Sequence, residues 1–330
     1  SMTKPWVSAL ALSFVEEGPL PLLDPVEKYL PEFSGLRVGR EVGEGIVYEP
    51  LKRPLTVYDL LRHTAGLTYG VFFRSPVKGL YLEAGVDRFD LSRGVFLERL
   101  AALPLRFQPG ETFEYGLATD LLGHLLEALA GRSLAELLEE RLFRPLGMKD
   151  SGFQAKDPAR LAQPFPKDPE TGHSLRLLPV ETPPPRYAGG MGGVGTAADY
   201  LAFLEALRLG RGALSPTMAG FMVQDHLGSL YPEALKRGPE YLPGPGYSFG
   251  LGVAVRVEPM GYSPGALGEW TWAGFGGTFF FVDPLQEITA LYLAQAPNLL
   301  SVLEPEKALH SRLGARLQHA FRTLVYLGLE

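Results

Sequence analysis

The chain has 330 residues, which is enough for one large domain with an ample core or for two intertwined ones. Its net charge of −6 is spread without long runs, which argues against a polyanionic partner, and we expect no nucleic acid to bind. The absence of cysteine excludes disulfides, thiolate metal sites and a cysteine nucleophile, and no apolar run reaches the ~18 residues of a membrane span.

The first predicted element is a largely apolar helix that ends at Gly18. Proline is tolerated only in a first helical turn, so Pro5 places Ser1 at or just before the helix start. Lys4 follows three residues later on the same face. Burial and the positive helix end both disfavour a charged lysine, which would let Lys4 take the serine proton. The alternative without catalysis is that Ser1 caps the helix and Lys4 is an ordinary surface lysine.

A second short helix is predicted after Leu55, because Thr56 and Asp59 form a capping box. It ends near His63, which could be a general base, although a structural hydrogen-bonding role is the more frequent one for such a histidine. Residues 68–92 are expected to form a loop rich in aromatic side chains, a composition that often lines substrate pockets.

Tyr115 precedes a helix predicted over Ala118 to Ala130, which Gly131 closes. A tyrosine in this place is usually a half-buried packing residue. Ser133 and Glu136 then cap a further helix.

Residues 153–188 are rich in proline and weakly periodic, so a long loop is expected. Residues 190–195 match G-x-G-x-x-G, but three prolines at 183–185 stand where a dinucleotide site needs a strand. We therefore predict a turn packed closely against the functional site. No metal-binding or P-loop motif occurs, and we expect no metal and no cofactor.

The last third of the chain alternates as strands do. Tyr247 to Val257, Trp270 to Val282 and Glu287 to Ala294 predict an antiparallel meander, and Leu303 to Leu327 predicts a long amphipathic helix. Together with the earlier helices, this pattern predicts an α+β fold, an antiparallel sheet flanked by helices plus a mostly helical subdomain.

A second candidate nucleophile is Ser263, in a G-x-S-x-G sequence followed by Asp283 and His310 in the order of an α/β-hydrolase triad. A nucleophile elbow joins a strand directly to a helix, whereas this segment leads into the strand that starts at Trp270. The Ser263 alternative stays open, behind Ser1.

Three stretches of the chain resemble one known family. Ser1-Met2-Thr3-Lys4, Tyr115 and Trp272-Ala273-Gly274, together with the residues near 16–18, 24–31 and 63–67, resemble serine β-lactamase-like proteins of the class C and penicillin-binding type. The resemblance is strongest to carboxylesterases (family VIII-like) of that superfamily. It implies the α/β sandwich of the serine β-lactamases, an acyl-enzyme on Ser1, and proton transfer by Lys4 and Tyr115.

Two of the family's usual motifs are altered in this chain. Leu117 replaces the asparagine of Y-x-N, and Trp272, Ala273 and Gly274 stand in place of K-T-G, as in many of the esterases. The resemblance makes these four residues the substrate-binding positions and gives Trp272 the wall of the acyl pocket. It also implies an oxyanion hole made by the backbone N–H groups of Ser1 and Phe275. Because the K-T-G lysine is absent, an anionic substrate loses its charge partner.

We therefore predict a serine hydrolase for small, uncharged carboxylic esters. The alternatives are a β-lactamase or D-amino-acid peptidase of the penicillin-binding type, an acyltransferase using the same residues, and a non-catalytic binding protein. Residues 1–330 are expected to form one catalytic unit, with a helical subdomain at about 20–190 and sheet elements at about 240–330. Family chains carry a segment ahead of S-x-x-K, so we expect one to be missing here. The expected compartment is the cytoplasm.

Overall fold

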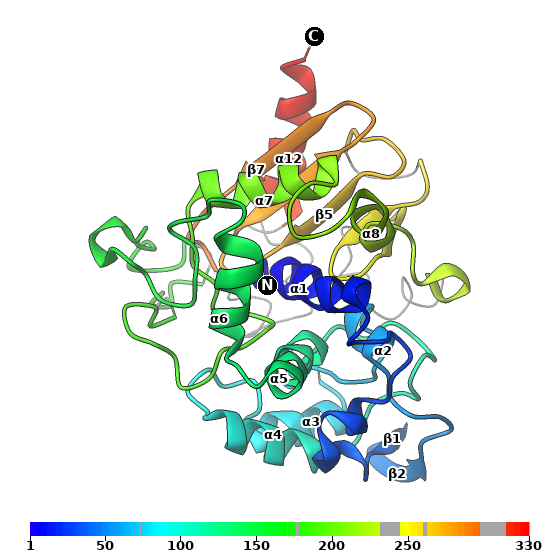
Figure 1. Cartoon of the computed structure of the whole chain (residues 1–330). Coiled ribbons are helices and arrows are strands. Elements are labelled where there is room, and N and C mark those ends of the chain that lie inside the picture. Colours follow the sequence, from blue (N-terminus) through cyan, green and yellow to red (C-terminus); the bar gives the residue numbers. More distant parts are fainter. Residues whose placement is uncertain are drawn as a thin grey trace.

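The chain is folded around its first helix. The computed structural model describes residues 1–72, 74–169, 171–175, 178–231, 245–259, 263–297 and 315–329. Helix α1 (Thr3–Glu17) lies in the middle of the molecule, between a helical part and a sheet (Figure 1). Every residue from Thr3 to Phe14 is buried, and Gly18 ends the helix in the left-handed conformation. The predicted apolar helix is confirmed.

The sheet has five antiparallel strands in the order β3-β4-β5-β6-β7, so the predicted meander is confirmed. Its strands are β3 (Tyr247–Phe249), β4 (Ala254–Arg256), β5 (Trp270–Ala273), β6 (Phe279–Asp283) and β7 (Ile288–Tyr292). The number of strands expected from the sequence was wrong, because two of the predicted strands are hairpins. Tight turns at Gly250 and Gly274 reverse the chain inside them, with hydrogen bonds from Gly250 N to Val253 O (2.7 Å) and from Gly274 N to Thr278 O (2.8 Å).

The two faces of the sheet are covered by different helices. Phe280 and Val282 of β6 point into the main core with α1, whereas Phe279 and Phe281 form a smaller cluster with α12 (Ala315–Leu327) on the other face. Helices α7 (Ala197–Leu209) and α8 (Pro216–Met222) lie on the α1 side (Figure 1). This alternation gives the layered α+β arrangement expected of the fold. Part of the predicted helix from Leu303 lies outside the described residues.

The helical part surrounds the other side of α1. It contains α2 (Val57–Leu61), α3 (Pro76–Ala84), α4 (Arg93–Ala101), α5 (Ala118–Ala130), α6 (Leu134–Leu138) and the π-helical turn η3 (Glu139–Phe143). Short 3-10 turns are η1 (Val26–Lys28), η2 (Pro31–Phe33), η4 (Pro158–Arg160) and η5 (Gly228–Leu230). The capping boxes that open α2 and α6 and the bounds of α5 are as predicted.

Several elements of this part were not predicted, among them α4. A hairpin of β1 (Arg37–Val42) and β2 (Gly45–Pro50) interrupts the proline-rich connection after α1. The expectation of a loop over residues 68–92 was wrong as well, because α3 occupies its middle. Ser75 caps α3 and Pro76 takes its first position, a start signal that the aromatic composition of the segment obscured.

None of the described helices is both long and apolar enough to cross a membrane. Over the same residues, no group of three or more histidine, aspartate or glutamate side chains is arranged to hold a metal ion.

Candidate active site

Ser1 lies two residues ahead of α1, and two polar groups reach its hydroxyl. Lys4 Nζ is 3.0 Å from Ser1 Oγ, and Tyr115 OH is 2.8 Å from the same oxygen. The structure thus brings together the three residues that the sequence analysis singled out for catalysis. Both contacts are short enough for direct proton transfer.

Lys4 is completely buried and has three hydrogen-bond partners. Besides Ser1 Oγ, its Nζ contacts Tyr69 OH at 3.2 Å and the carbonyl oxygen of Gly190 at 2.9 Å. The amine also lies 4.7 Å from the centre of the Tyr115 ring. The Gly190 carbonyl can only accept, so one N–H bond of the amine is directed there. When Lys4 is neutral, its lone pair can then be directed at the Ser1 hydroxyl.

The two residues between Ser1 and Lys4 are tied to the surrounding protein. Tyr200 OH donates to the carbonyl of Met2 at 2.8 Å, and the Gly193 N–H donates to Thr3 Oγ1 at 3.0 Å. The loop at 190–195 therefore packs directly on the first turn of α1, which confirms the predicted close turn. These contacts fix the spacing of Ser1 and Lys4.

Tyr69 was not predicted as a site residue, because the sequence marks it only as one of the aromatic residues within the predicted loop at 68–92. Burial raises the pKa of Tyr69 well above its usual value, so its phenol stays protonated beside Lys4. The backbone that follows is held by Asp87, whose carboxylate accepts hydrogen bonds from the N–H groups of Gly70 (2.8 Å) and Val71 (3.0 Å). Burial raises the pKa of Asp87 to about 6.

Tyr115 is fixed from both its ring and its backbone. Its ring packs against the rings of Tyr69 (5.5 Å between centres) and Trp272 (5.3 Å). The preceding residue, Glu114, is buried and accepts hydrogen bonds from Thr68 Oγ1 (2.5 Å) and Arg106 Nη1 (3.0 Å). A buried carboxylate with these partners is costly to move, so it anchors the loop that carries Tyr115.

His63 lies behind Tyr115, with 5.0 Å between the ring centres. Its side chain is completely buried, its backbone is left-handed at φ 56°, and its Nε2 is 3.4 Å from Thr119 Oγ1. Burial, and then the nearby charge of Lys4, lower the pKa of His63 well below its usual value. A neutral, buried ring with these contacts fits the structural role favoured from the sequence.

The sheet supplies the other wall of the site through the end of β5. Gly274 lies next to Ser1, because a methyl group placed on Gly274 would be 3.5 Å from the Ser1 backbone nitrogen. The next residue, Phe275, is exposed, and its ring lies 6.4 Å from that of Phe72 across the site. Ala273 is partly exposed and Trp272 is mostly buried.

Leu117, the fourth residue expected to bind substrate, is fully buried in the main core. In this conformation its side chain offers no surface to a substrate. Its direct contact with a substrate stays a prediction, which this burial disfavours.

The family model described as Beta-lactamase matches residues 1–310 of the chain. The chain belongs to the beta-lactamase family. The family recognised from the sequence is therefore confirmed.

Several relatives of this beta-lactamase family member carry functional names. The chain is 34% identical to Esterase EstB of Burkholderia gladioli over 314 residues, which cover 89% of this chain and 75% of that protein. It is 30% identical to the lovastatin esterase of Penicillium rubens, over 90% of this chain and 78% of the relative. Among solved structures it is similar to EstCE1, "a hydrolase with promiscuous acyltransferase activity", with a TM-score of 0.74 and 29% identity, covering 94% of this chain and 84% of that one.

The geometry around Ser263 differs from a nucleophile elbow. Ser263 lies in the connection between β4 and β5, and no helix follows it before β5. The carboxylate of Asp283 accepts hydrogen bonds from the backbone N–H groups of Ala266, Leu285 and Gln286. Asp283 therefore braces turns at the sheet edge, and His310 lies outside the described residues. In this beta-lactamase family member the described part of the Ser263 motif lacks the strand-turn-helix context of an α/β-hydrolase.

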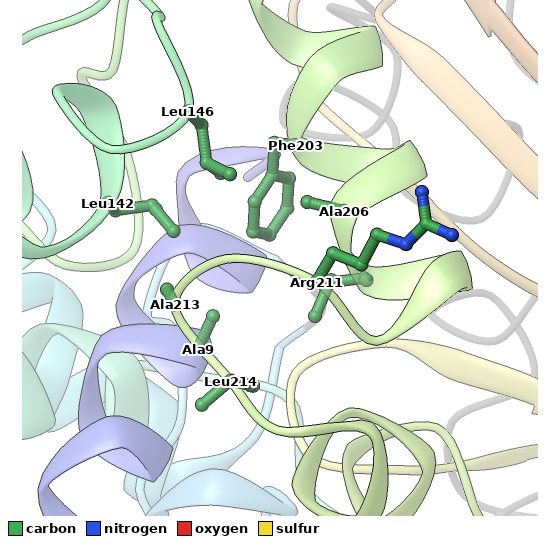
Figure 2. Close-up of a pocket in the computed structure, with 9 residues that line it drawn as sticks. Ala9, Leu142, Leu146, Phe203, Ala206, Arg211, Ala213 and Leu214 are labelled. Carbon is green, nitrogen blue, oxygen red and sulfur yellow. The ribbon is translucent and has the colours of Figure 1, made fainter.

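A small hollow lies farther along α1, away from Ser1 (Figure 2). It is lined by Ala9, Leu142, Leu146, Phe203, Ala206, Leu207, Arg211, Ala213 and Leu214. Its lining is aliphatic or aromatic apart from Arg211, whose guanidinium points away from the other labelled side chains in Figure 2. Without a nucleophile or a buried polar group, this hollow has none of the chemistry found around Ser1.

Proposed function

We propose that this member of the beta-lactamase family is a serine esterase, which hydrolyses small, uncharged carboxylic esters through an acyl-enzyme on Ser1. The observation that carries the proposal is the approach of Lys4 Nζ and Tyr115 OH to Ser1 Oγ, at 3.0 Å and 2.8 Å. A serine hydroxyl in contact with a buried amine and a phenol has the surroundings of an activated nucleophile. The names of Esterase EstB, the lovastatin esterase and EstCE1 support the same reaction class.

In the first step, Ser1 Oγ forms a bond to the ester carbonyl carbon while its O–H bond breaks and the proton passes to neutral Lys4 or through Tyr115. The carbonyl oxygen becomes negatively charged. We assign its stabilisation to the backbone N–H groups of Ser1 and Phe275, each worth roughly 3 kcal/mol in the transition state. The positive end of the α1 helix dipole also favours this negative charge, and no acidic residue in the first turn of α1 neutralises it.

In the second step, the carbon–oxygen bond to the alcohol breaks, and the alcohol leaves with the proton returned by Lys4 and Tyr115. Water then attacks the acyl-enzyme, and the same two groups remove its proton and return one to Ser1 Oγ. The sheet-side wall at Trp272, Ala273 and Phe275 is uncharged. This favours esters without a carboxylate over β-lactams and peptides that carry one.

The proposal is tested by combining turnover with covalent labelling. We expect hydrolysis of p-nitrophenyl butyrate, negligible turnover of nitrocefin, and a fluorophosphonate adduct on Ser1 mapped by peptide mass spectrometry. Ser1→Ala should abolish both activity and labelling, by about 10,000-fold or more in kcat. Ser263→Ala is the matched control and should retain both. Fast nitrocefin turnover without ester cleavage, or an adduct on Ser263, would overturn the assignment.

Acyl transfer to an alcohol is a second candidate, on the same acyl-enzyme. The rings of Phe72, Phe275 and Trp272 around the site favour binding of an apolar alcohol in place of water. EstCE1 is described as having this activity besides hydrolysis. Chromatography of p-nitrophenyl butyrate reactions with added benzyl alcohol would separate the two products, and butyric acid alone would exclude transfer.

A further inference from the structure

A buried carboxylate lies beside Lys4, on the other side of Gly190. Asp120 occupies the first turn of α5, and its side chain is completely buried. A methyl group placed on Gly190 would lie 2.2 Å from Asp120 Oδ2 and 3.3 Å from Lys4 Nζ. Only glycine therefore fits at position 190 without displacing Asp120 or Lys4. The lysine and the carboxylate are close enough to interact strongly in a buried site.

The two oxygens of Asp120 have different surroundings. Oδ1 accepts a hydrogen bond from Arg186 Nη1 at 3.2 Å, in an ion pair whose two side chains are both completely buried. The Arg186 guanidinium also lies 4.0 Å from the centre of the Phe96 ring. Oδ2 is buried and has no hydrogen-bond partner within the described part of the chain. The oxygen beside Gly190 is thus the one that Arg186 leaves free to act on Lys4.

The other titratable groups near Lys4 are Ser1, Tyr69, Tyr115, His63 and, beyond Tyr69, Asp87. The raised pKa of Tyr69 and the lowered pKa of His63 keep both side chains neutral. Asp87 is in electrostatic contact with Tyr69 and Asp120, but its hydrogen bonds go to the Gly70 and Val71 amides. Asp120, paired with Arg186, is therefore the carboxylate that faces Lys4 across Gly190.

We propose that Asp120 is a positioning residue for the proton transfer from Ser1, and that Arg186 limits its effect. When Lys4 takes the serine proton, the Oγ–H bond breaks, an Nζ–H bond forms, and the new ammonium is stabilised by the carboxylate across Gly190. Arg186 already pairs with the same carboxylate, so Lys4 is not the only basic side chain that Asp120 serves. Because the carboxylate of Asp120 is shared between Arg186 and Lys4, it can stabilise the ammonium of Lys4 and still allow Lys4 to release its proton. This inference rests on the esterase function proposed above.

The charges predict pH shifts of opposite sign, which a purely structural role would not produce. Asp120→Asn removes the carboxylate across Gly190 and leaves the Arg186 charge unpaired, so the acidic limb of the kcat/KM profile for p-nitrophenyl butyrate should move to lower pH by about one to two pH units. The plateau should fall about 10-fold or more, because the lysine becomes a weaker base. Arg186→Met leaves the carboxylate unbalanced, and the limb should move to higher pH by a similar amount. Shifts of the same sign, or none, would overturn the proposal.

Gly190→Ala supplies a variant that keeps every charge and separates Asp120 from Lys4. We expect its acidic limb to move in the same direction as that of Asp120→Asn, with Gly220→Ala as control, because a methyl group there meets nothing within 4 Å. If Asp120→Asn fails to fold, as judged by circular dichroism, the signs for Gly190→Ala and Arg186→Met decide the question. An unshifted limb in both would overturn the role of Asp120. Fluorophosphonate labelling of Ser1 in the unmodified protein is measured first, so failure of the esterase function is recognised separately.

Discussion

The two walls of the site are held by different kinds of contact. On the helical side, Tyr69 and Tyr115 lie in segments anchored by the partly buried carboxylate of Asp87 and the buried carboxylate of Glu114, through hydrogen bonds to backbone and side chains. On the sheet side, the indole of Trp272 packs against the rings of Tyr115 (5.3 Å between centres) and Phe249 (5.2 Å), and its Nε1 has no hydrogen-bond partner within the described residues. The side chains of the helical wall are thus held by hydrogen bonds to carboxylates, and the indole of the sheet wall is held by packing.

This difference indicates a division of labour. Proton transfer needs donor and acceptor within a few tenths of an ångström, and hydrogen bonds to buried charges provide such a fixed geometry. Selection of an acyl group needs only a surface of the right size, which packed rings provide and which substitutions can reshape. Changes on the helical wall should therefore lower the rate for every ester, and changes on the sheet wall should alter the preference among esters.

The largest effect is expected for Tyr115→Phe, which removes the hydroxyl 2.8 Å from Ser1 Oγ and keeps the ring contacts. Because the variant loses a proton-transfer group, kcat for p-nitrophenyl butyrate should fall by about 100- to 10,000-fold with little change in melting temperature. Steady-state kinetics and thermal unfolding measure the two quantities. A variant with nearly normal kcat would show that Tyr115 takes no part in proton transfer, and it would contradict the different roles assigned to the two walls.

Tyr69→Phe should have a smaller effect of the same kind. It deletes the phenol 3.2 Å from Lys4 Nζ, so the amine is held by one contact fewer and kcat should fall about 10-fold for short and long esters alike. Tyr81→Phe is the matched control, because it removes a buried phenol that donates to Pro104 O at 3.0 Å away from Lys4. A loss equal to that of the control would show that Tyr69 matters only for packing.

Trp272→Ala should change the preference among acyl chains. The indole is almost completely buried, and its removal should let octanoyl esters gain about 10-fold in kcat/KM relative to butyryl esters, since the wall recedes. Truncation of a buried tryptophan also costs about 3–5 kcal/mol of stability. Competition between p-nitrophenyl octanoate and butyrate measures the preference directly, and an unchanged ratio would exclude Trp272 from the acyl pocket.

Asp87→Asn tests the charge that anchors the helical wall through its pH dependence. Burial raises the pKa of Asp87 to about 6, so the folded state holds this proton more tightly than the unfolded chain does. The stability that protonation contributes is present at low pH and is lost as the pH rises through about 6. Relative to the natural protein, the asparagine variant should therefore gain about 1–3 kcal/mol between about pH 4.5 and pH 7.5 in urea unfolding.

The matched control for this comparison is Asp90→Asn, on the same segment. Asp90 is exposed and paired with Arg88, which holds the pKa of its carboxyl below the usual value. Its contribution therefore has the opposite sign and no gain is expected on raising the pH. An equal gain in both variants would show that the burial of Asp87 is not the cause.

Local sequence signals predicted the parts of the molecule that depend on neighbours along the chain. The Ser1-x-x-Lys4 spacing, the capping box at Thr56 and the glycine that closes α5 all act within one or two helical turns, and all are observed. The partners of Lys4 could not be predicted, because Tyr69 and Gly190 are 65 and 186 residues away in sequence. The local sequence around Gly190 does not indicate which side chain will donate a hydrogen bond to its carbonyl oxygen.

The misjudged strands have a similar cause. Residues 270–282 look like one apolar strand, because glycines at 274, 276 and 277 interrupt the apolar pattern only briefly. Whether such a segment continues or reverses depends on the strand that pairs with it, and here Trp272 pairs with Phe280. That reversal brings Gly274 beside Ser1, so the hairpin missed from the sequence is part of the site.

The central place of α1 has a consequence for how the protein loses activity on heating. The helix is buried from Thr3 to Phe14 and carries Lys4 in its first turn, and Ser1 lies two residues ahead of its start, with Lys4 Nζ 3.0 Å from Ser1 Oγ. Loop-borne sites can melt locally while the core persists, but here a displacement of Ser1 and Lys4 requires release of the element on which the other layers pack. Inactivation and loss of the core should therefore be one cooperative event, and amide hydrogens of α1 should exchange only through global unfolding.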